Sequence, residues 1–269
     1  MQLAIPKITV KYFNQLSLSM FQKAIIISIL FFSVVISHPS VGQRKITKVA
    51  GDQFNIEIDR SSSANFTLLQ VTDLHLGSPH EDKWRRDLIT CRRIKKLVET
   101  HNPDIIVITG DLFDGNKPFG NLLAAYAVNL FDNFERPWLY AFGNHDPEGG
   151  FGRADIEKVF AQSQWGILGK HEVQNKWKEK YDYVVNLKLK DQTKPVWQLY
   201  GFDSGAEKGN KSIKTEQLEW FKKMSEKSAE AFGSKTRALS FFHIPLIEYQ
   251  YLKDDSTIVK QGMSEEKVF

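Results

Sequence analysis

The feature of this sequence that most constrains its fold is a short apolar run that ends directly in a cluster of Asp, Asn or His side chains. The pattern occurs four times, in residues 66–75, 105–111, 138–146 and 238–243. Short apolar runs of this kind, bounded by polar or glycine residues, are typical of strands. In open α/β sheets, ligands bind at the edge where the strands end. The four clusters are therefore expected to contribute to one site.

Helical patterns separate these runs, and the alternation predicts a layered α/β domain. A chain of 269 residues, of which 42% are apolar and 25% charged, is long enough for one large core. Besides the four runs, we expect strands at residues 54–58, 183–189 and 196–202, and helices at residues 84–101, 122–134, 154–161 and 215–232.

The side chains in these clusters are of the types that bind metal ions. Asp73 and His75 are two residues apart, so on an extended chain they share one face and can hold one ion together. Asp111 has two carboxylate oxygens and can bridge two ions, while Asn144 offers an amide oxygen and His243 an imidazole nitrogen. Oxygen and nitrogen donors without a thiolate favour zinc, manganese or iron.

Taken in order, the motifs resemble those of the calcineurin-like metallophosphoesterases. The matching segments are DLH at 73–75, GDLFD at 110–114, GNHD at 143–146 and FFHIP at 241–245. The surrounding residues are most similar to the purple-acid-phosphatase-like branch of that family. The resemblance implies a four-layer α/β/β/α sandwich with two sheets packed face to face.

The resemblance also implies a role for each candidate residue. Asp73 and His75 would bind the first ion, Asp111 would bridge both ions, and Asn144 and His243 would bind the second. The cofactors would be two ions drawn from iron, zinc and manganese, and a hydroxide held between them would attack the phosphorus atom.

Two further residues are expected to act in catalysis without binding metal. The resemblance implies that His145 contacts the substrate, where it stabilises the transition state or protonates the leaving oxygen. Asp146 would orient the ring of His145. A histidine oriented by a carboxylate is a suitable proton donor near neutral pH.

The sequence departs from the family pattern at two places. Position 114 is Asp where purple members carry a tyrosinate, which predicts a colourless protein that is not restricted to iron. The motif G-H-x-H, which supplies one ligand to each ion, is absent, because no histidine follows His243. Truncation of the sequence is the interpretation we favour. The alternatives are that water or a partner chain fills the gap, or that the enzyme is weak.

The N-terminal segment reads as a targeting signal. Lys23 precedes an apolar run at residues 24–36, and the small residues Ser40 and Gly42 follow at a spacing that a signal peptidase accepts. The run is shorter than the roughly 20 residues that span a bilayer, which favours a removable signal over an uncleaved anchor. We therefore expect a secreted, periplasmic or lumenal protein without stable membrane insertion. The expected divisions are a signal peptide at 1–42, a lead-in at 43–62 and an incomplete metallophosphoesterase domain at 63–269.

The motifs favour hydrolysis of small phosphomonoesters and leave two alternatives open. One is a phosphodiesterase for nucleotides or lipid headgroups, and the other is a truncated protein that binds metal or phosphate without catalysis. The formal net charge is +4, and residues 1–42 account for +3 of it. The rest of the chain is therefore nearly neutral, and no nucleic-acid partner is expected. The lone cysteine, Cys91, is expected to be a buried apolar residue of a helix. The oligomeric state is left open.

Overall fold

The computed structural model describes residues 44–60, 65–77, 83–113, 120–148, 151–171, 181–205, 212–246, 248–249, 251 and 257. The expected signal peptide and the predictions made for Asp114 lie outside these residues.

One of the two sheets is parallel throughout and carries most of the polar clusters. Its order is β3-β4-β5-β6, and every neighbouring pair runs in the same direction. The carboxyl ends of these strands therefore meet at one edge. The strands are β3 (Leu68–Val71), β4 (Ile105–Thr109), β5 (Trp138–Ala141) and β6 (Gly166–Ile167).

The second sheet is mixed and has the order β1-β2-β7-β8-β9. Strand β2 runs parallel to β7, and β8 runs parallel to β9, while the other two pairs are antiparallel. The described part of the expected lead-in, residues 44–60, thus supplies two strands of this sheet. The strands are β1 (Arg44–Ala50), β2 (Gln53–Ile58), β7 (Tyr183–Leu189), β8 (Trp197–Gly201) and β9 (Ala238–Phe241).

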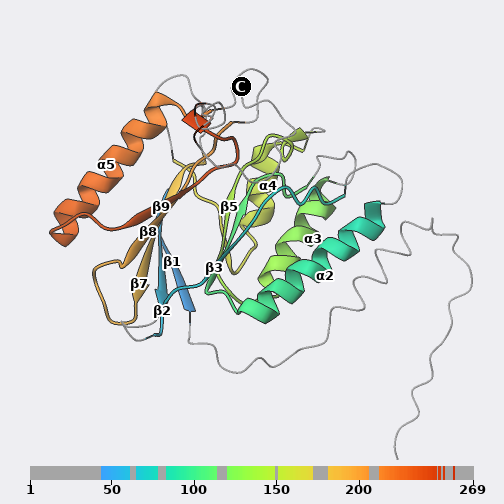
Figure 1. The fold of residues 1–269 in the computed structure, drawn as a ribbon, viewed down its shortest axis with the longest axis horizontal. Coiled ribbons are helices and arrows are strands. Elements are labelled where there is room, and N and C mark those ends of the chain that lie inside the picture. Colours follow the sequence, from blue (N-terminus) through green and yellow to red (C-terminus); the bar gives the residue numbers. More distant parts are fainter. Residues whose placement is uncertain are drawn as a thin grey trace, which may run out of the picture. The chain divides into compact units, whose positions relative to one another are not determined.

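Within the described residues, four helices cover the outer faces of the two sheets (Figure 1). Three of them pack on the parallel sheet and α5 packs on the mixed sheet. None of the helices in the described ranges has both the length and the apolar character that crossing a bilayer requires. The helices are α2 (Lys83–His101), α3 (Gly120–Asp132), α4 (Arg153–Phe160) and α5 (Thr215–Phe232).

Three apolar clusters separate the layers and follow from the alternation of side chains along each strand. On β4, Ile106 and Ile108 face the helices α2 to α4, whereas Val107 faces the other sheet. A third cluster joins Tyr200 of β8 to Trp220 of α5. The order of layers is therefore helix, sheet, sheet, helix, which confirms the expected four-layer sandwich. Cys91 is buried in the first of these clusters, as expected.

Candidate metal centre

Backbone hydrogen bonds join the loops after β3 and β4 at the expected edge. The amide of Asp73 donates to the carbonyl of Gly110 at 3.1 Å, and the amide of His75 donates to the carbonyl of Asp111 at 2.9 Å. The backbone φ angles of Asp73, His75 and Asp111 are 54°, 43° and 49°. These values lie in the left-handed region, which residues other than glycine rarely adopt. Strained backbone of this kind clusters at functional sites.

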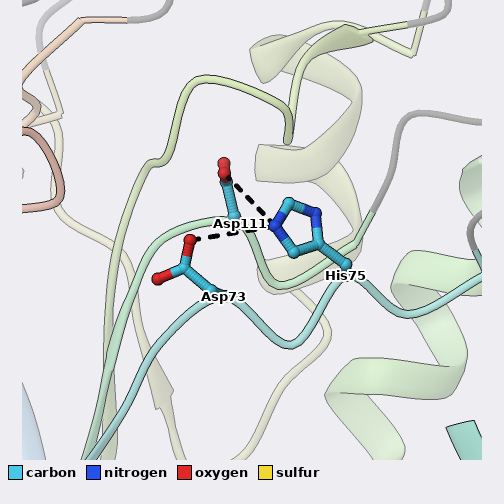
Figure 2. A group of neighbouring side chains, drawn as sticks. All are labelled: Asp73, His75 and Asp111. Carbon is cyan, nitrogen blue, oxygen red and sulfur yellow. Dashed lines mark ion pairs between the residues drawn. The ribbon is translucent and has the colours of Figure 1, made fainter. Parts of the chain in front are cut away.

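The side chains of these three residues point toward one another (Figure 2). Nε2 of His75 lies 3.8 Å from Oδ1 of Asp73 and 3.8 Å from Oδ2 of Asp111. One ligand atom from each residue lies within 4.8 Å of the other two. Donors that share one ion at about 2.0–2.2 Å lie at most roughly 4.4 Å apart. Because the Asp73 side chain is 52% exposed and can adjust, the three residues fit one ion.

His243 approaches the same carboxylate from the mixed sheet. Its Nε2 lies 3.3 Å from Oδ2 of Asp111, and its Nδ1 donates a hydrogen bond of 2.8 Å to the carbonyl of Thr109. Histidines that bind metal are commonly oriented by such a bond from the second ring nitrogen. Oδ2 of Asp111 is thus near the imidazoles of both His75 and His243, the arrangement that a bridging carboxylate requires.

The charges around Asp111 also suit a cation. Burial raises the pKa of the Asp111 carboxyl, but the hydrogen bond and charge of His243 outweigh this effect and lower it. For His243 the directions are reversed: burial lowers the pKa of the imidazole, but the hydrogen bond and charge of Asp111 outweigh burial and raise the pKa to about 9. A buried carboxylate needs a positive partner. A proton on His243 supplies that partner when no ion is present, and metal binding would displace it.

The loop after β5 brings Asn144 and His145 to the same edge. The amide of Gly143 donates to Asp146 at 2.7 Å, and the amide of His145 donates to Oδ1 of Asp111 at 2.8 Å. Asn144 is half-buried between these two anchored residues. Its role as a ligand of the second ion stays a prediction.

The carboxylate of Asp146 contacts the backbone of two loops at this edge. Its carboxylate is fully buried and accepts hydrogen bonds from the amides of Gly143, Asp111, Leu112 and Phe113 at 2.7–3.3 Å. Burial raises the pKa of this carboxyl to about 6, although the bond from Gly143 lowers it. Asp146 therefore joins the loops after β4 and β5 and positions Asp111, and its expected role of orienting the ring of His145 stays a prediction.

Glu148 supplies a carboxylate at the ring of His145. Its Oε2 lies 2.9 Å from Nδ1 of His145, and the His145 ring lies 5.5 Å from the ring of His75. Sequence reasoning missed Glu148, although an acidic residue three positions after a histidine in a turn is a usable signal. The His145 side chain is 40% exposed, so a substrate can reach it.

Gly143 is required by the close approach of the two loops. A Cβ atom at this position would overlap both the carboxylate and the backbone nitrogen of Asp111. We expect Gly143→Ala to displace Asp111 and to lower the metal content of the protein. Metal analysis of the purified variant measures this effect. Gly152→Ala is the matched control because open space surrounds that position. Full metal content in Gly143→Ala would contradict the expectation.

The two-sheet sandwich and the carboxylate and imidazole groups at its edge are those of a metal-dependent phosphoesterase. A model of the calcineurin-like phosphoesterase family matches residues 66–262, and the chain belongs to this family.

Curated relatives resemble purple acid phosphatases. The chain is 27% identical over 263 residues to probable inactive purple acid phosphatase 28 of Arabidopsis thaliana, covering 85% of this chain and 65% of the relative. It is 28% identical over 243 residues to probable inactive purple acid phosphatase 29 of the same plant, covering 77% and 60%. The chain thus spans less than two thirds of these relatives. A dimetal phosphatase from Danio rerio aligns over 67% of this chain and 70% of its own, with 13% identity and a TM-score of 0.43.

Proposed function

We propose that this protein hydrolyses phosphate esters with two metal ions, and that small phosphomonoesters are its substrates. The observation that carries the proposal is the position of Oδ2 of Asp111, 3.8 Å from Nε2 of His75 and 3.3 Å from Nε2 of His243. Asp73 and His75 would complete one binding position, and Asn144 and His243 the other. Iron, zinc and manganese all suit these donors.

The residues of the chain would divide the work of catalysis. When bound, a pair of ions activates water and neutralises charge on the phosphoryl oxygens. Asp146 keeps Asp111 in place by accepting hydrogen bonds from the backbone amides of Asp111 and Gly143. Glu148 holds Nδ1 of His145 and so orients the ring, from which the second nitrogen would donate a proton to the leaving oxygen.

Two aryl phosphates test the function and separate its two catalytic forms. We expect the protein to turn over p-nitrophenyl phosphate faster than bis-p-nitrophenyl phosphate, because a monoester places more negative charge between the ions. Treatment with a chelator should abolish turnover, and added zinc, manganese or iron should restore it. A faster rate with the diester would favour a phosphodiesterase. Undiminished turnover in the chelated protein would exclude the metal-dependent mechanism.

A protein that binds metal or phosphate without catalysis is the second candidate. One observation favours it: similar relatives carry the words "probable inactive" in their names. In that case the protein would retain ions on metal analysis and bind inorganic phosphate by calorimetry, but would turn over neither aryl phosphate.

A further inference from the structure

A cavity of about 640 Å³, apart from the metal centre, opens among four segments that lie far apart in the sequence. Its walls are the turn between β1 and β2, helix α4, the segment after β6 and helix α5. None of the predicted metal ligands lines it. The lining includes four basic residues and two rings: Lys48, Lys170, Lys223, Lys227, His171 and Trp220.

Hydrogen bonds and ring stacking hold the walls of this cavity together. The amide of Lys170 donates to the carbonyl of Gly51 at 2.9 Å, which joins the segment after β6 to the turn between β1 and β2. The rings of His171 and Trp220 stack at 5.2 Å with only 4° between their planes. His171 is held in turn by the buried carboxylate of Asp182 at 2.8 Å. The cavity is therefore formed before any ligand arrives.

The two carboxylates that line the cavity already have partners. Asp52 accepts a hydrogen bond of 2.9 Å from the indole of Trp220. Glu157 lies 3.2 Å from the ammonium of Lys170 and also accepts from the hydroxyl of Tyr181 at 3.0 Å. Glu157 offsets Lys170, whereas Asp52 keeps its negative charge, so the four lysines of the lining exceed its two carboxylates by two positive charges.

Three lysines face the cavity without a carboxylate of their own. Across the described residues, no ion pair involves Lys48, Lys223 or Lys227. Like charges that converge on a concave surface raise the local positive potential and concentrate anions there. Ammonium groups act as point charges on flexible stems, so they suit a chain of phosphates better than one planar carboxylate.

We propose that this cavity binds a small multivalent phosphate, such as a diphosphate or triphosphate group, at a site separate from the metal centre. Its volume lies within the range of about 300–1,000 Å³ usual for small-molecule sites. One face of Trp220 is covered by His171, so recognition rests on charge and not on stacking with a base. The proposal does not depend on catalysis at the metal centre.

Calorimetry with inorganic tripolyphosphate tests the site in the full chain. The titration is made in chelator at low salt, so that no ion at the metal centre can bind the phosphates. We expect binding by the unaltered protein, and at least about a tenfold weaker affinity in the double variant Lys223→Gln with Lys227→Gln, because two attractive charges are removed. Affinity should fall as salt is added, and orthophosphate should bind more weakly than tripolyphosphate.

A neighbouring lysine provides the matched control. Lys222 is exposed on the same helix but does not line the cavity, so Lys222→Gln should bind like the unaltered protein. Asp111→Asn should also retain binding, since it alters only the metal centre. The proposal is overturned if the protein does not bind tripolyphosphate, if the double variant binds with unchanged affinity, or if Lys222→Gln loses as much affinity as the double variant.

Discussion

The Asp111→Ala variant is expected to lose both metal ions and at least about 10³-fold in turnover. Removal of a single group that stabilises transition-state charge typically costs 10²–10³-fold. Asp111 is expected to act on two ions at once, because its Oδ2 lies near the imidazoles of both His75 and His243. Metal analysis and turnover of an aryl phosphate, measured on the same preparation, test both parts of the expectation.

A second variant separates loss of metal binding from loss of structure. Asp111→Ala also leaves the amide of His145 without its 2.8 Å acceptor, which can disturb the loop. Asp111→Asn retains an oxygen for that amide and removes only the charge, so it should stay closer than Asp111→Ala to the thermal stability of the chelator-treated parent while losing metal. Asp59→Asn, at an exposed aspartate paired with Lys190, is the control for a missing charge. Two retained ions in Asp111→Asn would rule out the bridging role.

The His145→Ala variant is expected to lose about 10²–10⁴-fold in turnover, the range for a residue that transfers a proton in the transition state. Its metal content should stay that of the parent, because His145 is not a predicted ligand. The ring is partly exposed and lies beside His75, with Glu148 at Nδ1. Steady-state kinetics combined with metal analysis distinguish this expectation from a ligand role.

A remote histidine serves as the control for this substitution. His101 is exposed at the end of α2, and His101→Ala should change neither turnover nor metal content. Unchanged turnover in His145→Ala would remove this residue from the mechanism. A loss of one ion would show instead that His145 is a ligand.

Much of the fold could be predicted because its elements have strong local patterns. Strand β7 and helix α5 begin and end where the sequence predicts, at Tyr183–Leu189 and Thr215–Phe232. The apolar residues recur with the period of a strand in β7 and with the period of a helix in α5. Every residue of β4 is buried, as its run of β-branched residues indicates.

Elements without such a pattern were missed. Strand β1 is largely exposed and carries charged residues along its length, and β6 is only two residues long. Each is a strand because a neighbour supplies its hydrogen bonds: β2 pairs with β1, and β5 pairs with β6. The partner of β6 lies well back along the chain, at Trp138–Ala141, outside a local window of sequence. The partner of β1 follows directly, but the exposed and charged residues of β1 give no apolar alternation that would indicate a strand.

The sequence by itself determined which residues approach the metal edge, since Asp73, His75, Asp111 and His243 each follow a strand in a motif of fixed order. Only the tertiary structure decided which of the two carboxylates, Asp111 or Asp146, lies between imidazoles and which is buried among backbone amides. Asp111 and Asp146 are the same residue type, each in a glycine-containing motif after a strand. Asp111 lies between two imidazoles, which favour a charged carboxylate that can share cations. The carboxylate of Asp146 is fully buried among backbone amides, and these donors, which come from two separate loops, make it a structural anchor.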